Sequence, residues 1–194
     1  MNIGIDIDDT LTNIRDELKL AAEKYANKLG KEIKDSKYIE DQNNGNIYQI
    51  KYGFTYEELK YFLSVIQEEI TKKAEPREGC VEVINKLHNK GHKIYIITAR
   101  DSEFHKDPYE LSKNWLDKNN IYYDKLIVNA RSKAPVCKTE KIDIFIDDQL
   151  NNCVDVSKAG IRAIRISNDD NSSYENIETL LNWNKIYNYI NEME

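Results

Sequence analysis

This chain of 194 residues has few cysteines, no long apolar run and no excess of positive charge. The three cysteines, Cys80, Cys137 and Cys153, are far apart and form no C-x-x-C pair. Their odd number and the lack of a signal peptide fit a reducing compartment. No apolar run approaches the ~18 residues that a membrane span needs. We therefore expect a cytoplasmic protein that does not enter a membrane.

Acidic residues outnumber basic ones, 34 against 28, which gives a formal net charge of −6. Binding to a nucleic-acid polymer requires a basic surface that contacts the phosphates, so we do not expect such a partner. A single nucleotide remains compatible with this charge, because one metal ion and two cations can hold it. The length accommodates one α/β domain with an insertion.

The most informative segment is residues 2–12, where an apolar, β-branched run leads directly into three aspartates and a threonine. Carboxylates at the end of a buried strand repel one another and are costly to desolvate. They persist where a cation binds or where one of them reacts. Asp6, Asp8 and Thr10 are therefore candidate site residues.

Two other interpretations of this segment must be weighed. The D-x-D-x pattern also opens EF-hand calcium loops, and Glu17 falls at the twelfth position counted from Asp6. The sixth position, however, is Leu11, where the loop needs glycine, and the preceding residues are typical of a strand. A purely structural acidic turn is the second alternative.

The apolar pattern predicts strands and helices that alternate after residue 80. We expect strands at 2–7, 93–98, 125–129, 142–146 and 161–166. We expect helices at 13–29, 56–73, 80–90, 108–119, 134–140, 150–159 and 175–190, with irregular chain over 31–54. The alternation predicts a parallel sheet with right-handed crossovers. The first strand belongs to this sheet, so residues 14–75 form a mostly helical insertion between two core segments, 1–13 and 76–194.

Polar side chains follow four of the predicted strands, and ligands of open α/β sheets bind at the carboxyl ends of the strands. The four segments are Asp6-x-Asp8-x-Thr10, Thr98-Ala99-Arg100, Arg131-Ser132-Lys133 and Asp147-Asp148. Carboxylates, hydroxyls and cations are therefore expected to converge on one edge of the sheet. The three histidines, His88, His92 and His105, have no metal-ligand spacing, and we expect them on the surface.

In this order, the four segments resemble the motifs of haloacid-dehalogenase-type phosphohydrolases. The resemblance implies an α/β fold with a Rossmann-like core, in which helices flank a parallel sheet, and a small helical cap inserted after the first strand. It implies Mg²⁺ as cofactor. Asp6 would attack phosphorus and form an aspartyl-phosphate, and Asp8 would act as acid and then as base. Asp6, the Asp8 carbonyl and the acidic pair would hold the metal, with Asp148 as direct ligand and Asp147 behind it.

The resemblance also implies a set of phosphate-binding groups: Thr98 Oγ, backbone N–H groups around Ala99 and Arg100, and a lysine. Lys133 is favoured because it begins a helix just after the third strand, and Lys138 is the rival.

Ordinary roles compete for the same residues. Thr10 is grouped with the phosphate-binding residues, although ordering of the turn after Asp8 suffices to explain it. Thr98 alone is typical of a hydroxyl that caps backbone, and Arg100 can pair with Asp101 or another acid.

Within the superfamily, the chain resembles the cytosolic-type 5′(3′)-deoxyribonucleotidases and related bacterial nucleotidases. Residues 4–10, 96–100 and 133–148 carry this resemblance, which covers the core well and the insertion poorly. It implies a small phosphorylated partner, a nucleoside monophosphate. The insertion contains several aromatic residues, among them Tyr48, Tyr52 and Phe54. They either pack in the protein interior or stack on the base of a nucleotide.

Alternative functions remain open: a phosphatase or phosphomutase acting on another small phosphate such as a sugar phosphate, or a catalytically idle binding protein. A phosphorelay receiver domain would lack both the insertion and the Asp6-x-Asp8-x-Thr10 spacing. The sequence leaves the oligomeric state open, a homodimer included.

Overall fold

The computed structural model describes residues 1–34, 47–167, 174 and 176–193. The chain divides into two compact units. The first, which we call the core unit, comprises Met1–Asn13, Glu75–Ser102 and Asp107–Glu194. The second, the insert unit, comprises Ile14–Ala74 together with Glu103–Lys106. The sequence prediction places Glu103–Lys106 in the core, because no signal in the sequence separates this segment from its neighbours.

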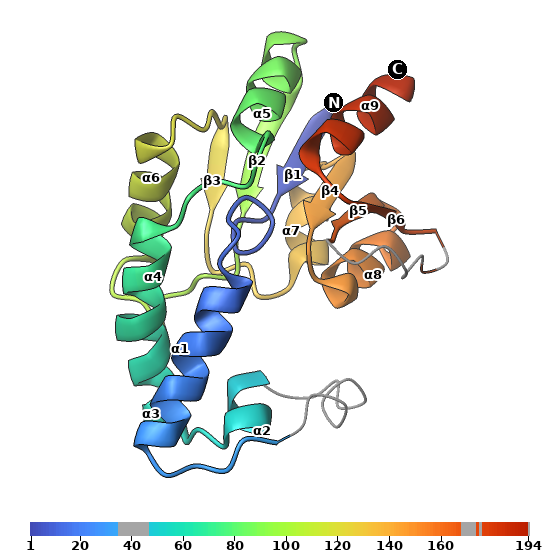
Figure 1. Cartoon of the computed structure of the whole chain (residues 1–194). Coiled ribbons are helices and arrows are strands. Elements are labelled where there is room, and N and C mark those ends of the chain that lie inside the picture. The colour runs from blue at the N-terminus through green and yellow to red at the C-terminus, as the bar shows by residue number, and fades with distance from the viewer. Residues whose placement is uncertain (35–46, 168–173, 175, 194) are drawn as a thin grey trace. The chain divides into compact units, whose positions relative to one another are not determined.

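The core unit is built on a six-stranded sheet with the order β3-β2-β1-β4-β5-β6, and every pairing is parallel. The strands are β1 Asn2–Ile5, β2 Lys93–Ile97, β3 Lys125–Ile127, β4 Ile144–Asp147, β5 Arg162–Ile166 and β6 Glu178–Leu180. Its helices are α5 Cys80–Asn89, α6 Pro108–Lys118, α7 Lys133–Thr139, α8 Leu150–Lys158 and α9 Trp183–Glu192. These helices flank the sheet (Figure 1), which confirms the predicted Rossmann-like α/β core.

The central strand β1 is surrounded by apolar side chains. Ile3 and Ile5 are fully buried, as expected for a strand covered on both faces. Gly4 makes room for its neighbours, because a Cβ at this position would lie 3.1 Å from side-chain atoms of Ile97 and Phe145. A larger residue would push these side chains away and shift the strand that leads into the acidic loop.

The carboxyl-terminal region differs from the prediction. The helix expected over 175–190 is instead strand β6 followed by α9, whose first turn is capped by Asn182 Oδ1 accepting from Lys185 N at 3.0 Å. Residue 175 lies outside the described residues. A strand of three residues is too short to show a period of two, so its pairing with β5 decides its conformation.

The insert unit is helical, with α1 Arg15–Lys28, α2 Ile47–Tyr52, α3 Tyr56–Tyr61, π-helix η2 Phe62–Gln67 and α4 Glu68–Lys73. Helix α2 lies in the segment predicted to be irregular, of which residues 35–46 are outside the described residues. The predicted helix 56–73 begins with a capping box formed by Thr55 and Glu58. Its middle turn is π-helical, a local widening that apolar spacing does not reveal.

Aromatic side chains form the interior of the insert unit. The ring of Phe62 is fully buried, and its centroid lies 4.7 Å from that of Tyr48 and 5.7 Å from that of Phe54. Tyr52 and Phe54 are each 3% exposed. The sequence left open whether these aromatic residues pack or stack on a base. In this structure Tyr52 and Phe54 pack in the interior of the insert unit.

Two histidines expected on the surface are buried. His92 is 4% exposed, with Nδ1 3.2 Å from the amino group of Met1, and His105 is 6% exposed, with Nδ1 3.4 Å from Glu68 Oε2. Both positions are decided by tertiary partners far away in the sequence. None of the helices in the described part of the chain has both the length and the apolar character needed to cross a bilayer.

Candidate active site

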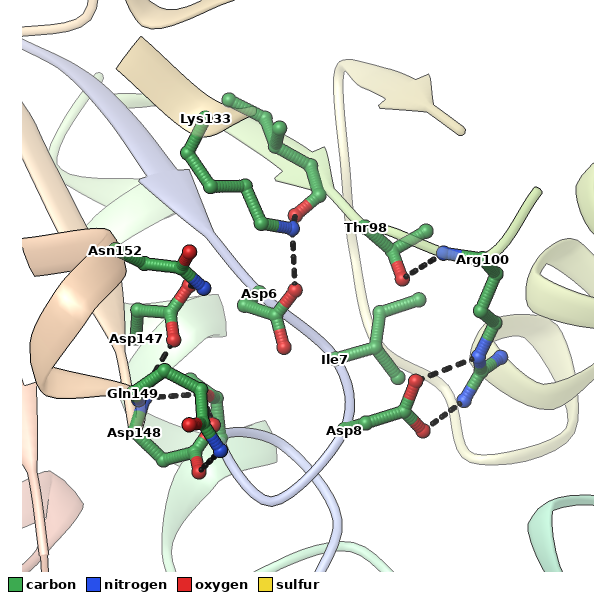
Figure 2. Close-up of polar contacts among 12 residues, drawn as sticks. Asp6, Ile7, Asp8, Thr98, Arg100, Lys133, Asp147, Asp148, Gln149 and Asn152 are labelled. Carbon is green, nitrogen blue, oxygen red and sulfur yellow. Dashed lines mark hydrogen bonds and ion pairs between the residues drawn. The ribbon is translucent and has the colours of Figure 1, made fainter. Parts of the chain in front are cut away.

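The carboxyl ends of β1 and β4 bring two acidic segments together. Strand β1 pairs with β4 so that Ile5 lies opposite Ile146, and Asp6 N donates to the Ile146 carbonyl at 3.0 Å. Asp6 and Asp147 therefore occupy the same edge of the sheet. Carboxylate oxygens of Asp6, Asp147 and Asp148 all lie within 4.8 Å of one another (Figure 2). The expected convergence of these segments is present in the structure.

Lys133 lies against this acidic cluster. It is the first residue of α7, its side chain is 1% exposed, and its Nζ is 2.6 Å from Asp6 Oδ1 and 2.7 Å from the Ile97 carbonyl. Lys138, the rival from the sequence, is exposed on the same helix. The helix start places one lysine at the site, and the next lysine along the helix, five residues later, is in solvent.

The environment of the cluster disfavours negative charge. Burial raises the pKa of Asp6, while Lys133 opposes the shift and the charge of Asp8 adds to it. Burial and then the charge of Asp6 raise the pKa of Asp147 well above its usual range, with Lys133 again opposing the shift. Two buried carboxylates, those of Asp6 and Asp147, thus share the compensation that Lys133 provides.

This donor set suits a hard divalent cation. All ligand atoms are carboxylate oxygens, which Mg²⁺ prefers, and a cation would offset both the burial and the like-charge repulsion that raise the two pKa values. The acidic pair is also held in place: Gln149 N donates to Asp147 Oδ1 at 2.8 Å and Asn152 Nδ2 donates to Asp147 Oδ2 at 2.9 Å. The buried acidic residues therefore fit the metal that the resemblance implies.

Asp8 and Arg100 form a second pair next to the cluster. Arg100 Nε and Nη2 donate to the two carboxylate oxygens of Asp8 at 3.0 and 2.7 Å (Figure 2). Arg100 Nη1 donates to Ser112 Oγ at 3.3 Å. Asp101, the partner considered from the sequence, pairs with Arg131 instead. The guanidinium of Arg100 thus contacts the predicted acid–base residue in this structure.

The remaining predicted residues line the ends of β1 and β2. Thr98 is 1% exposed, and its Oγ accepts from Arg100 N at 3.3 Å, while Ala99 is exposed between them. Thr10 is fully buried, and its Oγ accepts from Asp148 N at 2.9 Å. In this structure the hydroxyls of Thr10 and Thr98 therefore bond to protein groups.

Four residues of the site were missed from the sequence: Ser112, Gln149, Asn152 and Trp183. Gln149 and Asn152 follow the acidic pair directly and within one turn of α8, so their proximity to it was a usable signal. Ser112 on α6 and Trp183 on α9 come from helices whose positions only the tertiary structure supplies.

Comparison with known proteins gives concordant results. A family model described as "5′ nucleotidase, deoxy (Pyrimidine), cytosolic type C protein" matches residues 1–193. A nucleotidase of Clostridium acetobutylicum is 28% identical over 196 residues, which cover 100% of this chain and 95% of that protein.

Solved structures share the fold at low identity. A haloacid dehalogenase-like hydrolase of Streptococcus pneumoniae superposes with a TM-score of 0.69 at 15% identity, covering 97% of both chains. A HAD-hydrolase of Bacillus subtilis, described as bound to magnesium, has a TM-score of 0.62 at 14% identity and covers 98% of both chains. These two likenesses concern the fold.

Proposed function

We propose that this chain, which belongs to the family of cytosolic type C 5′ (deoxy)nucleotidases, is a Mg²⁺-dependent phosphomonoesterase that acts on nucleoside monophosphates. Membership makes it a phosphatase of the nucleotidase class. The metal, the covalent mechanism and the substrate are our proposal. The observation that carries it is the position of Asp6, whose carboxylate is buried between the Lys133 ammonium and the acidic pair Asp147-Asp148.

Asp6 is the nucleophile in this proposal. One of its oxygens attacks phosphorus as the bond from phosphorus to the substrate oxygen breaks, which leaves an aspartyl-phosphate, an acyl phosphate, at Asp6 and releases a nucleoside. Lys133, 2.6 Å from Asp6 Oδ1, balances charge on the oxygens of the transferred phosphoryl group. Thr98 Oγ and the N–H groups near Ala99 contribute hydrogen bonds to the same oxygens.

Asp8 moves the proton in both steps. It gives a proton to the departing ester oxygen and later takes one from the water that hydrolyses the aspartyl-phosphate to inorganic phosphate, so the enzyme returns to its starting state. Arg100 holds both Asp8 oxygens through a bidentate pair, which fixes the direction of the carboxylate. We assign Arg100 to the orientation of Asp8 in addition to its expected place near the phosphate.

Mg²⁺ would be held by Asp6, the Asp8 carbonyl and Asp148, with Asp147 behind them. When bound, it supplies positive charge for the phosphate oxygens and for the buried carboxylates. The buried acidic cluster and the raised pKa values of Asp6 and Asp147 support this assignment.

The insert unit is assigned to substrate recognition. It leaves the core directly after the loop that carries Asp6 and Asp8, at Ile14. In this proposal it acts as a cap that excludes water and selects the organic part of the substrate.

The test is a panel of phosphate esters assayed with Mg²⁺ and with a chelator. We expect turnover of nucleoside monophosphates that needs Mg²⁺ and is lost in Asp6→Asn. The matched control is Asp155→Asn, which changes an exposed aspartate on α8. Turnover of sugar phosphates without nucleotides would overturn the substrate assignment, and turnover that survives chelation or Asp6→Asn would overturn the mechanism.

A further inference from the structure

The first residue of the last helix reaches the acidic loop at the other end of the sequence. Trp183 begins α9, its side chain is fully buried, and its indole Nε1 donates to the backbone carbonyl of Thr10 at 3.2 Å. A buried carbonyl needs such a donor, because an unpaired one costs the full desolvation of the group. Trp183 therefore holds the turn that follows Asp6 and Asp8.

Thr10 continues this connection into the acidic pair. Its Oγ accepts from Asp148 N at 2.9 Å and donates toward Asp148 Oδ1 at 3.4 Å, and the residue is fully buried. Two bonds thus link the threonine hydroxyl to one metal-site aspartate, while the threonine carbonyl is bonded to the indole. The carbonyl and the hydroxyl belong to one residue, so a shift of its backbone moves the hydroxyl as well.

The indole itself is anchored. Asn182 caps the first turn of α9, so the start of the helix is fixed. Gly79 lies beside Trp183: its φ is +78°, and a Cβ there would be 3.7 Å from Trp183 Cβ. Helix α9 packs against α5, which Gly79 precedes directly. The position of the acidic loop therefore depends, through Trp183, on the packed pair of helices α5 and α9.

We propose that Trp183 is a positioning residue for the metal site, acting through Thr10 on Asp148. The inference rests on the proposed function, in which Asp148 binds Mg²⁺. Replacement of a residue that is hydrogen-bonded to a metal ligand commonly weakens metal binding by roughly 10- to 100-fold. Trp183 acts one residue further away, so we expect Trp183→Phe to weaken Mg²⁺ binding by about three- to tenfold.

The first measurement uses the intact protein and MgCl₂ alone. The chain contains two tryptophans, Trp115 and Trp183, so a nitrogen-15 spectrum has two indole N–H signals. Trp115→Phe identifies which signal belongs to Trp183. We expect Mg²⁺ to shift the Trp183 signal with the same midpoint as the heat of binding measured by calorimetry, and to leave the Trp115 signal in place.

The second measurement compares Mg²⁺ affinity in variants of the two tryptophans. Trp115 is a matched control, because it is also buried in the core unit, at 2% exposure on α6. Trp183→Phe should lose affinity, and Trp115→Phe should stay within about twofold of the parent protein. If Trp183→Phe fails to fold, 3-benzothienylalanine at position 183 keeps the ring size and removes only the N–H donor.

The outcomes separate this inference from the proposed function. Mg²⁺ binding by the parent protein that leaves the Trp183 signal unmoved overturns the positioning role alone. Equal Mg²⁺ affinities for the Trp183 and Trp115 variants overturn it too. Absence of Mg²⁺ binding by the parent protein overturns the proposed metal site, and the inference with it.

Discussion

The two units of this chain fill their interiors in opposite ways. The core unit buries charged side chains at one edge of its sheet, among them Asp6, Arg100, Lys133, Asp147 and Asp148. The insert unit packs aromatic rings, and the buried polar residues in its described part are Thr71 and His105.

The difference indicates that the buried charges of the core unit serve reactivity, whereas the buried rings of the insert unit serve packing. Buried charges cost stability unless they are paired, and burial raises the pKa values of Asp6 and Asp147 although Lys133 opposes the shift. Aromatic packing adds stability without a chemical function of its own. Substitutions in the core edge should therefore change activity most, and substitutions in the aromatic interior should change stability most.

The largest effect is expected for Asp6→Asn. Removal of the nucleophile should lower kcat for nucleoside monophosphates by at least ~10⁴-fold, about 5.5 kcal/mol in activation free energy. Thermal unfolding should stay within a few degrees of the parent protein, because asparagine keeps the shape of the side chain and an oxygen that can accept from Lys133. Steady-state kinetics and calorimetry check both parts. An active variant, or one that is inactive because it is unfolded, would contradict the comparison.

The opposite behaviour is expected for Phe62→Ala in the insert unit. Loss of a fully buried ring should lower the free energy of unfolding by roughly 3–5 kcal/mol. Val65→Ala on the same π-helix, at 43% exposure, is the control and should cost less than about 1 kcal/mol. Denaturant titration measures both, and equal costs would show that the aromatic interior does not support the unit.

Arg100→Met tests the pair with Asp8. A mispositioned acid slows departure of a poor leaving group such as a ribose oxygen, so we expect about a 10²-fold lower kcat for nucleoside monophosphates. An activated ester, 4-nitrophenyl phosphate, needs little acid assistance and should lose less than about tenfold. If Arg100 acted mainly on the phosphate, KM would rise equally for both substrates. Arg131→Met, at a guanidinium with 55% side-chain exposure, is the control.

The smallest effect concerns the stability of the metal-free protein. The folded-state pKa of Asp147 is raised, so its ionisation destabilises the fold as pH rises above the unfolded value, 3.8. Asp147→Asn should therefore stabilise the metal-free protein at pH 8 by about 1–2 kcal/mol, and the gain should vanish as pH falls toward 4. Denaturant titration at both pH values in a chelator tests this, and a gain that persists at low pH would indicate another cause.

Sequence patterns were sufficient for the parts of this protein that depend on local order. Apolar runs ending in polar residues predicted five of the strands, the parallel core and the convergence of Asp6, Lys133 and the acidic pair. Parallel strands must place their carboxyl ends at one edge, so this outcome needed no tertiary information. The short strand β6 was missed, because three residues carry no usable periodicity.

Side-chain partners were beyond the sequence. Which acid Arg100 contacts depends on the loops that follow β1 and β2, whereas the burial of Lys133 and the reach of Trp183 to Thr10 depend on where α7 and α9 pack. Hydrogen-bond partners are chosen by distances of about 3 Å, whereas periodicity specifies only which face of an element is covered. The order of motifs along the chain thus determined the class of chemistry, and the tertiary packing of helices and strand-end loops decided which side chains hold the reacting groups in place.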